Sequence, residues 1–162
     1  MTVLVSPMLI TEAARTAELV REVITPLEYY SAEARASEVS KYTPEKLKEL
    51  VREDPLSVIL ARSGSNLAGF CISRFDDGII WLAWFGVHEE WRRLSVGELL
   101  LSALDDAANA RGCHKIWCDT RTDNEKSQRA LRRAGYSLIC SVSRHWYAQD
   151  FYLWEKFVEL KQ

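Results

Sequence analysis

No stretch of this sequence is long and apolar enough to cross a membrane. The longest apolar run, Ile79 to Val87, has nine residues, whereas a membrane-spanning helix needs about 20. The first residues, MTVLVSPMLI, lack the basic start and the small-residue cleavage pattern of a secretory signal. These absences predict a cytoplasmic protein without a membrane partner.

The sequence also lacks cysteines and histidines at metal-binding spacing. Its 4 cysteines are scattered without a CxxC pair, and its 3 histidines are far apart. Neither a zinc site nor a disulfide framework is therefore expected. We expect no bound metal and free, mostly buried thiols.

A strong positive charge is missing as well, since the formal net charge is −2. This argues against a general nucleic-acid-binding protein. The charge is uneven along the chain. Residues 111–162 carry 10 basic and 6 acidic side chains, a net charge of +4. Residues 1–54 carry 7 basic and 10 acidic side chains and residues 55–110 carry 4 basic and 7 acidic ones, a net charge of −3 for each segment. The asymmetry is either a chance feature of solvated faces, or it places an anionic ligand near the C-terminal third and a cationic ligand near the N-terminal third.

What is present fits one α+β domain over residues 1–162, with 48% hydrophobic and 27% charged residues. Short turns join the second to fourth strands into a meander, and a crossover helix makes the next strand parallel. We expect a mixed, mostly antiparallel sheet of six or seven strands with four or five helices, in the order β-α-α-β-β-β-α-β-α-β-β. Expected strands cover 3–10, 57–62, 67–75, 79–87, 115–119, 136–144 and 151–160, and expected helices cover 11–25, 43–54, 96–111 and 124–134, with a short one over 31–41.

The segment RRLSVGELLL (92–101) places two arginines and a glycine at the start of an apolar helix. The first amides of a helix are unpaired and carry a partial positive charge, so they can bind phosphate, and glycine removes the Cβ that would block its approach. A solvent-facing turn before a capped helix is the alternative. A P-loop is excluded, because Gly97 is followed by Glu98 and Leu99 rather than by Lys and Ser or Thr.

Residues 87–100, VHEEWRRLSVGELL, resemble the acetyl-CoA signature of the GNAT superfamily of N-acetyltransferases, Gln/Arg-x-x-Gly-x-Gly/Ala. Arg92 and Gly97 take its first and last positions, and Ser95 stands where its first glycine usually lies. Residues 124–136, NEKSQRALRRAGY, resemble the second signature of the family. The expected order of elements also agrees with this family, which implies a GNAT-like fold.

The resemblance implies direct transfer of an acetyl group from acetyl-CoA to a primary amine of a small molecule, protein or peptide. An acyl-CoA-binding sensor or interaction module with little or no turnover is the alternative. By analogy with relatives, the paired terminal strands suggest a possible homodimer. The acetyl-CoA-binding residues implied by the resemblance are Phe85, Val87, Arg92, Arg93, Leu94, Ser95, Val96, Gly97, Glu98, Asn124 and Ser127.

Two positions depart from the family pattern at the cofactor. Ser95 adds a Cβ at the phosphate turn, and we expect a negative φ there, which would leave its hydroxyl free to donate to a phosphate. Leu131 stands where many relatives carry a tyrosine that protonates the CoA thiolate. Tyr147 or His145 is the candidate to replace that general acid.

The general base is missing from its usual strand, because Trp81–Trp84 contains no carboxylate. Glu28, Glu33, His88 or a chain of waters are the candidates for this role. The acceptor pocket is expected to form from residues 26–31, the strand with Trp84, and residues 144–150. Its expected walls are Tyr29, Tyr30, Trp84, Trp146 and Tyr147, which suit an apolar acceptor or a cation. Three other tryptophans are expected in the core: Trp81, Trp117 and Trp154. Cys118, on the strand beside the expected thioester, is expected to be a packing residue and not a nucleophile.

Overall fold

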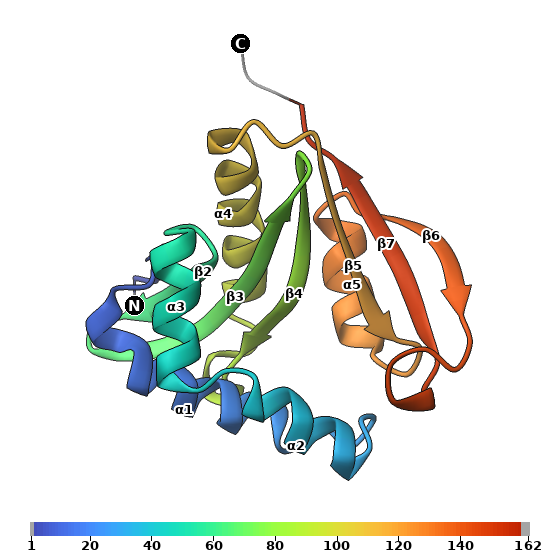
Figure 1. Ribbon diagram of the computed structural model, residues 1–162, viewed down its shortest axis with the longest axis horizontal. Coiled ribbons are helices and arrows are strands. Elements are labelled where there is room, and N and C mark those ends of the chain that lie inside the picture. Colours follow the sequence, from blue (N-terminus) through green and yellow to red (C-terminus); the bar gives the residue numbers. More distant parts are fainter. Residues whose placement is uncertain (1, 160–162) are drawn as a thin grey trace.

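The structure is a computed structural model that describes residues 2–159. Within these residues, seven strands form one open sheet in the order β1-β2-β3-β4-β5-β7-β6 (Figure 1). β4 and β5 run parallel and all other neighbours are antiparallel, which confirms the expected mixed, mostly antiparallel sheet. The strands are β1 (Leu4–Pro7), β2 (Val58–Ser63), β3 (Asn66–Asp76), β4 (Ile79–Val87), β5 (Lys115–Arg121), β6 (Ser137–Val142) and β7 (Phe151–Phe157).

Three helices connect β1 to β2, one connects β4 to β5, and one connects β5 to β6. The expected order, with two helices before the second strand, is wrong by one helix, because the short segment near 31–41 is a helix of its own. Ser31 starts it by accepting a hydrogen bond from the Ala34 amide at 3.2 Å. None of the helices within residues 2–159 is long and apolar enough to span a membrane. The helices are α1 (Ala13–Ile24), α2 (Ala32–Ser40), α3 (Pro44–Glu53), α4 (Val96–Ala110) and α5 (Glu125–Arg133).

The helices cover both faces of the sheet, and β2 shows how they are divided. Val58 and Leu60 pack in one core cluster with α1 and α3, whereas Ile59 and Ala61 pack in another with α4. Successive side chains of a strand point to opposite faces, so α1 and α3 lie on one face and α4 on the other. Leu131 of α5 belongs to the α4 cluster. Both faces of the sheet are therefore held rigidly where the strands run toward the site.

β4 and β5 pair only at their beginnings. Ile79 to Leu82 lie opposite Lys115 to Cys118, and beyond that point the two strands separate (Figure 1). A β-bulge accompanies the separation, because Leu82 and Trp84 of β4 pair with consecutive residues of β3 and Ala83 is left over. Bulges bend a strand. The second half of β4 therefore has no strand partner on the side of β5.

The end of the chain differs slightly from the expected boundaries. The last strand was expected over 151–160, but β7 ends at Phe157. Leu160, its expected last residue, lies outside the described residues. β7 pairs with both β5 and β6, so the C-terminal hairpin extends the sheet beyond the point where β4 and β5 separate.

Candidate functional site

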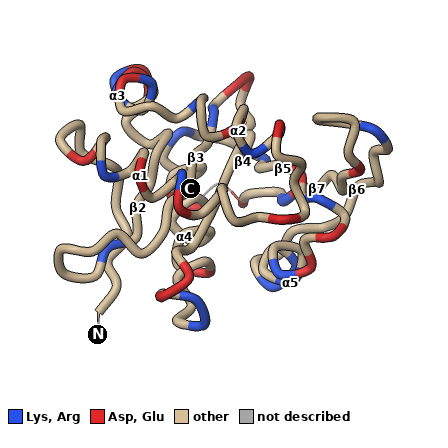
Figure 2. Tube along the Cα trace, turned by 90° about the horizontal axis from the view of Figure 1, so that it is seen from below, with Lys and Arg blue, Asp and Glu red and all other residues tan. Residues whose placement is uncertain are grey.

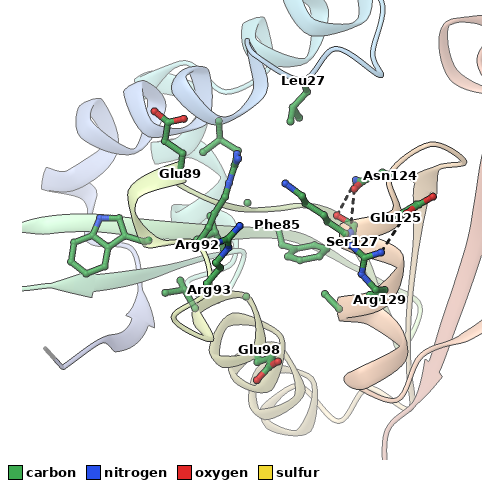
Figure 3. Close-up of a pocket in the computed structure, with 18 of the residues that line it drawn as sticks. Leu27, Phe85, Glu89, Arg92, Arg93, Glu98, Asn124, Glu125, Ser127 and Arg129 are labelled. Atoms are coloured by element: carbon green, nitrogen blue, oxygen red, sulfur yellow. Dashed lines mark hydrogen bonds and ion pairs between the residues drawn. The ribbon is translucent and has the colours of Figure 1, made fainter.

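A cleft with a volume of about 1280 Å³ opens where β4 and β5 separate. It is bounded by the end of β4, by the turn over residues 92–95, and by the N-terminal ends of α4 and α5. Figure 3 shows Arg92 and Arg93 on one side of this cleft and Asn124, Ser127 and Arg129 on the other, with the Phe85 ring between them. We call it the cofactor cleft below. It brings together the two sequence signatures, which residues 101–123 separate in the chain.

The turn before α4 has an unusual backbone. Arg93 has φ 68° and Ser95 has φ 57°, both in the left-handed region. Left-handed residues in a tight turn direct successive amides toward a common point, which makes a concave anion-binding site. The expected negative φ of Ser95 is wrong. As N-cap of α4, this residue reverses the chain between the short 3-10 helix Glu89–Trp91 and α4, and serine adopts the conformation of the usual glycine at a cost of about 1 kcal/mol.

The first amides of α4 are available to a ligand. The Ser95 side chain makes no capping hydrogen bond to them, and they have no intrahelical acceptor. Gly97 lies in this first turn, and a Cβ added to it would come no closer than 3.8 Å to the Val87 side chain. Packing within the protein therefore does not require glycine at this position. Its lack of a side chain leaves room toward the cleft instead.

The opposite wall is the start of α5. Asn124 caps this helix: its Oδ1 accepts from the Ser127 amide at 3.1 Å, and its Nδ2 donates to Ser127 Oγ at 2.9 Å. Lys and Arg positions lie along α5 (Figure 2). Arg133 reaches Glu98 of α4 at 3.3 Å, so an ion pair connects the two helices that border the cleft. The two walls therefore carry charges of both signs: the basic residues are Arg92, Arg93, Lys126, Arg129 and Arg133, and the acidic residues are Glu89, Glu98, Asp123 and Glu125.

Among the acetyl-CoA-binding residues implied by the sequence, only Leu94 is absent from the lining of this cleft, and its side chain is exposed. Tyr29, expected in the acceptor pocket, lines the cofactor cleft instead. The others that line it are Phe85, Val87, Arg92, Arg93, Ser95, Val96, Gly97, Glu98, Asn124 and Ser127.

A second cavity, with a volume of about 650 Å³, adjoins the cofactor cleft. The two share Trp84, Phe85, Asn124 and Ser127 in their linings, so they meet where β4 leaves β5. We call the second one the acceptor cavity. Helix α2 and the hairpin between β6 and β7 form its outer walls. Its aromatic lining consists of Tyr30, Tyr42, Trp81, Trp84, Phe85, Trp117, Trp146, Tyr147 and Phe151.

Two tryptophans of this cavity were expected in the core, and that expectation is wrong. Trp81 and Trp117 are half-buried neighbours across β4 and β5, with their ring centroids 5.1 Å apart in an edge-to-face arrangement. The strand pattern alone does not show that a cavity lies over this face. Trp154 is fully buried, which confirms it as a core residue.

Glu38 of α2 holds a hydrogen-bond network at the edge of the acceptor cavity. Its Oε2 accepts from Trp84 Nε1 at 2.8 Å, and its Oε1 accepts from Tyr147 OH at 2.8 Å and from Lys41 Nζ at 2.5 Å. Tyr147 OH also lies 2.9 Å from Ser37 Oγ. The network connects α2 to the β6–β7 hairpin. Tyr147, a candidate from the sequence, therefore lies in the cavity with its hydroxyl held by a carboxylate.

Asp119 of β5 lines the same cavity. Its Oδ2 accepts a hydrogen bond from Trp146 Nε1 at 2.7 Å, and His145 Nε2 lies 4.0 Å from the same oxygen. Burial raises the pKa of this carboxyl above its usual range, although the bond from Trp146 opposes the effect. The sequence analysis missed Asp119. The available signal was a carboxylate near the end of the strand KIWCD, which follows the crossover helix.

The remaining sequence candidates lie in different places. His145 lines the acceptor cavity, whereas Glu28, Glu33 and His88 line neither cavity. His88 lies 3.8 Å from Glu22 of α1 instead. Leu131 is fully buried in the core. Within residues 2–159, no group of three or more His, Cys, Asp or Glu side chains could hold a metal ion.

Comparison with known proteins identifies the fold and then the family. The structure is similar to an acetyltransferase of the GNAT family from Streptococcus pneumoniae (TM-score 0.83, 18% identity, 98% of this chain and 100% of that chain). It is also similar to the paia N-acetyltransferase from Thermoplasma acidophilum in complex with coenzyme A (TM-score 0.80, 19% identity, 97% of this chain and 99% of that chain). A third similar structure is yncA from Salmonella typhimurium with its cofactor acetyl-CoA (TM-score 0.74, 15% identity, 99% of this chain and 96% of that chain). Residues 22–136 match the Acetyltransferase (GNAT) family, and the chain belongs to it.

Proposed function

We propose that the chain transfers an acetyl group from acetyl-CoA to a primary amine. The observation that carries this proposal is the junction of two cavities at Trp84 and Phe85. One cavity ends in an anion-binding turn, and the other is an aromatic chamber with carboxylates. A thioester bound in the first and an amine bound in the second would meet at this junction.

The cofactor cleft suits the two charged and extended parts of acetyl-CoA. The left-handed turn and the first amides of α4 would bind the pyrophosphate, with additional charge from Arg92 and Arg93. The unpaired second half of β4, from Ala83 to Val87, would bind the pantetheine amides as a further strand would. The coenzyme A and acetyl-CoA complexes of the similar structures support this assignment.

The acetyl group would pass directly from sulfur to nitrogen. Cys118, the cysteine among the cavity residues, is buried, and burial raises its pKa well above the usual range, so a nucleophilic thiolate is disfavoured. Backbone amides near Val87 would stabilise the oxyanion of the tetrahedral intermediate. Leu131 has no proton to donate, and Tyr147 and His145 line only the acceptor cavity. The attacking nitrogen would therefore supply the proton that neutralises the CoA thiolate.

The first experiment is thermal melting of the protein with and without saturating acetyl-CoA. At about 100 times the dissociation constant, binding at one site adds roughly 2.7 kcal/mol, which raises the melting temperature of a domain of this size by about 5–10 °C. Absence of a shift at millimolar acetyl-CoA would contradict the proposal. CoA release is then measured with a panel of small alkylamines and with peptides that carry a free amino group. If acetyl-CoA raises the melting temperature but no amine of the panel causes CoA release, the protein is a binding module and not an enzyme.

A further inference from the structure

We propose that Asp119 receives the ammonium group of the acceptor amine and removes its proton. The inference rests on the proposed function, and it assigns a general base that the sequence pattern of β4 does not provide. It also restricts the acceptor, because the site is built for an alkylammonium ion that must be deprotonated before it attacks.

The position of Asp119 follows from the register of the parallel pair. The last paired residues are Leu82 and Cys118. Asp119 is the next residue of β5 and stands level with Ala83, where β4 bulges away. It is therefore the first residue of β5 that no longer faces a paired strand on this side. The next residues of β4, Trp84 and Phe85, line both the cofactor cleft and the acceptor cavity, and Asp119 lines the acceptor cavity.

The two carboxylates of the acceptor cavity differ in how many protein partners they have. Glu38 accepts hydrogen bonds from three side chains and is neutralised by Lys41. Asp119 accepts one hydrogen bond, from Trp146, through Oδ2. Its side chain is 14% exposed, so this carboxylate is shielded by the protein and still reachable from the cavity. Asp119 is thus the carboxylate with capacity left for a ligand.

The rings near Asp119 also suit a cation. Tyr30 and Trp84 lie with their ring centroids 5.5 Å apart, and Trp146 donates to Asp119 itself. Ammonium groups are attracted to the faces of such rings as well as to a carboxylate. Apolar walls further favour the neutral amine over the ammonium ion once the proton has moved to Asp119.

Several charged and titratable groups surround Asp119 and would affect its titration. His145 comes from the β6–β7 hairpin, Glu38 from α2, and Tyr30 from the connection between α1 and α2. His145, when protonated, lowers the pKa of Asp119, whereas Glu38 raises it. Burial has the largest effect and raises it. A raised pKa makes the carboxylate a stronger base for an ammonium group. Further groups in or near the cavity are Lys41, Arg74, Arg121 and Cys118.

The reaction balances in protons. Asp119 takes one proton from R–NH3⁺, and the resulting R–NH2 attacks the thioester carbonyl carbon. A C–N bond forms, the C–S bond breaks, and the CoA thiolate takes a second proton from the nitrogen. The products are the N-acetyl amine and CoA, and Asp119 returns its proton to solvent.

The test compares wild-type protein with Asp119→Asn, using the fastest alkylamine of the panel. Asparagine keeps an oxygen that accepts from Trp146, so this variant removes the base and retains the hydrogen bond to the hairpin. At pH 7 the rate of CoA release should fall about 10²–10⁴-fold. The difference should narrow as the pH approaches about 10, because the amine then loses its proton to solvent. The shift in melting temperature with acetyl-CoA should be unchanged.

Two further measurements separate a catalytic role from a structural one. The folded-state pKa of Asp119 is raised, so its ionised form destabilises the protein above that pKa, and Asp119→Asn should melt no lower than wild type at pH 7. Asp106→Asn, a matched change at an exposed position of α4, should release CoA at the wild-type rate. A loss of less than threefold in Asp119→Asn, or an equal loss at every pH, would overturn the inference. If wild-type protein itself releases no CoA with any amine, the proposed function fails first and Asp119 loses its role with it.

Discussion

The cofactor cleft and the acceptor cavity are built in different ways. The end of the cleft where we propose that phosphate binds is a continuous stretch of chain, residues 92–98, with a left-handed turn and the first amides of α4. The cavity is built of side chains from α2, β3, β4, β5 and the β6–β7 hairpin. A site made of local backbone can be found as a sequence motif, whereas a site made of distant side chains forms no continuous motif in the sequence.

The two regions differ in electrostatics as well. Arg92 and Arg93 line one side of the cleft and Arg129 of α5 lines the other, with Glu89, Glu98 and Glu125 among the same lining residues (Figure 3). The cavity contains two shielded carboxylates, Glu38 and Asp119. An anionic cofactor and a cationic acceptor would thus be directed to different openings. The charge asymmetry between the two ends of the sequence suggested such a division, although Asp119 lies in the basic C-terminal third.

The largest expected effect is on the backbone site. Gly97→Ala should raise helix stability by up to about 1 kcal/mol, since the new Cβ meets only the Val87 side chain at 3.8 Å. In the proposed complex the same Cβ would take the space of a phosphate oxygen, and losing one charge-assisted hydrogen bond costs about 1.5–3 kcal/mol, or roughly 10- to 100-fold in acetyl-CoA affinity. Calorimetric titration and melting of the same samples measure both. Ser102→Ala, exposed in the same helix, should change stability alone. An unchanged affinity of Gly97→Ala for acetyl-CoA would contradict the distinction between a cleft built of backbone and a cavity built of side chains.

A smaller effect, confined to the acceptor side, is expected for Glu38→Gln. Loss of its charge removes the partner of Lys41 and weakens the bond from Tyr147. The KM for the amine should rise about fivefold, which corresponds to about 1 kcal/mol, and acetyl-CoA binding should stay the same. Steady-state kinetics with each substrate varied in turn test this. Glu49→Gln, which disrupts an exposed pair of the same spacing with Lys46, serves as the control. A parallel loss of acetyl-CoA affinity in Glu38→Gln would show that the two cavities are not independent.

Trp146→Phe is expected to shift the pH profile and to change the maximal rate little. The bond from Trp146 lowers the pKa of Asp119, so its removal should raise that pKa. Because Asp119 must be ionised to accept a proton, the acidic limb of the rate profile should move to higher pH. Rates of CoA release between pH 5 and pH 9 measure the shift. A limb that moves to lower pH would contradict the assignment of Asp119 as the titrating base.

The smallest effect is expected for Ser95→Gly. Glycine removes about 1 kcal/mol of strain at this left-handed position, which raises the free energy of unfolding. The greater freedom of the unfolded chain lowers the same free energy by about 0.4–1 kcal/mol. The melting temperature should therefore barely change, and acetyl-CoA affinity should rise by up to about threefold. Ser102→Gly, at a right-handed position, should instead lower stability by about 0.5 kcal/mol. A tenfold weaker affinity in Ser95→Gly would mean that the serine hydroxyl itself contacts the ligand.

Much of the fold followed from periodicity and turn residues. All seven strands and the helices at 44–53, 96–110 and 125–133 were expected near their observed positions, because apolar residues recur at the spacing of each element. The short helix α2 was expected as a segment but left out of the element order. Its start depends on one Ser31 cap, and it buries only Ala34. Such a helix carries little periodic signal.

The sequence by itself determined the order of the elements and the backbone site, because both depend on residues close together in the chain. Arg92, Gly97 and Asn124 could be assigned from their resemblance to the two family signatures. Tyr30, Trp84, Trp146 and Tyr147 were expected in the acceptor pocket and line the acceptor cavity, whereas tertiary structure decided the rest of the acceptor side. The separation of β4 from β5 turned Trp81 and Trp117 from expected core residues into cavity walls, and it left Asp119 in the lining of the acceptor cavity. The physical reason is that burial, pKa and shape at this point depend on neighbours that are distant in the chain and become neighbours only when the sheet forms.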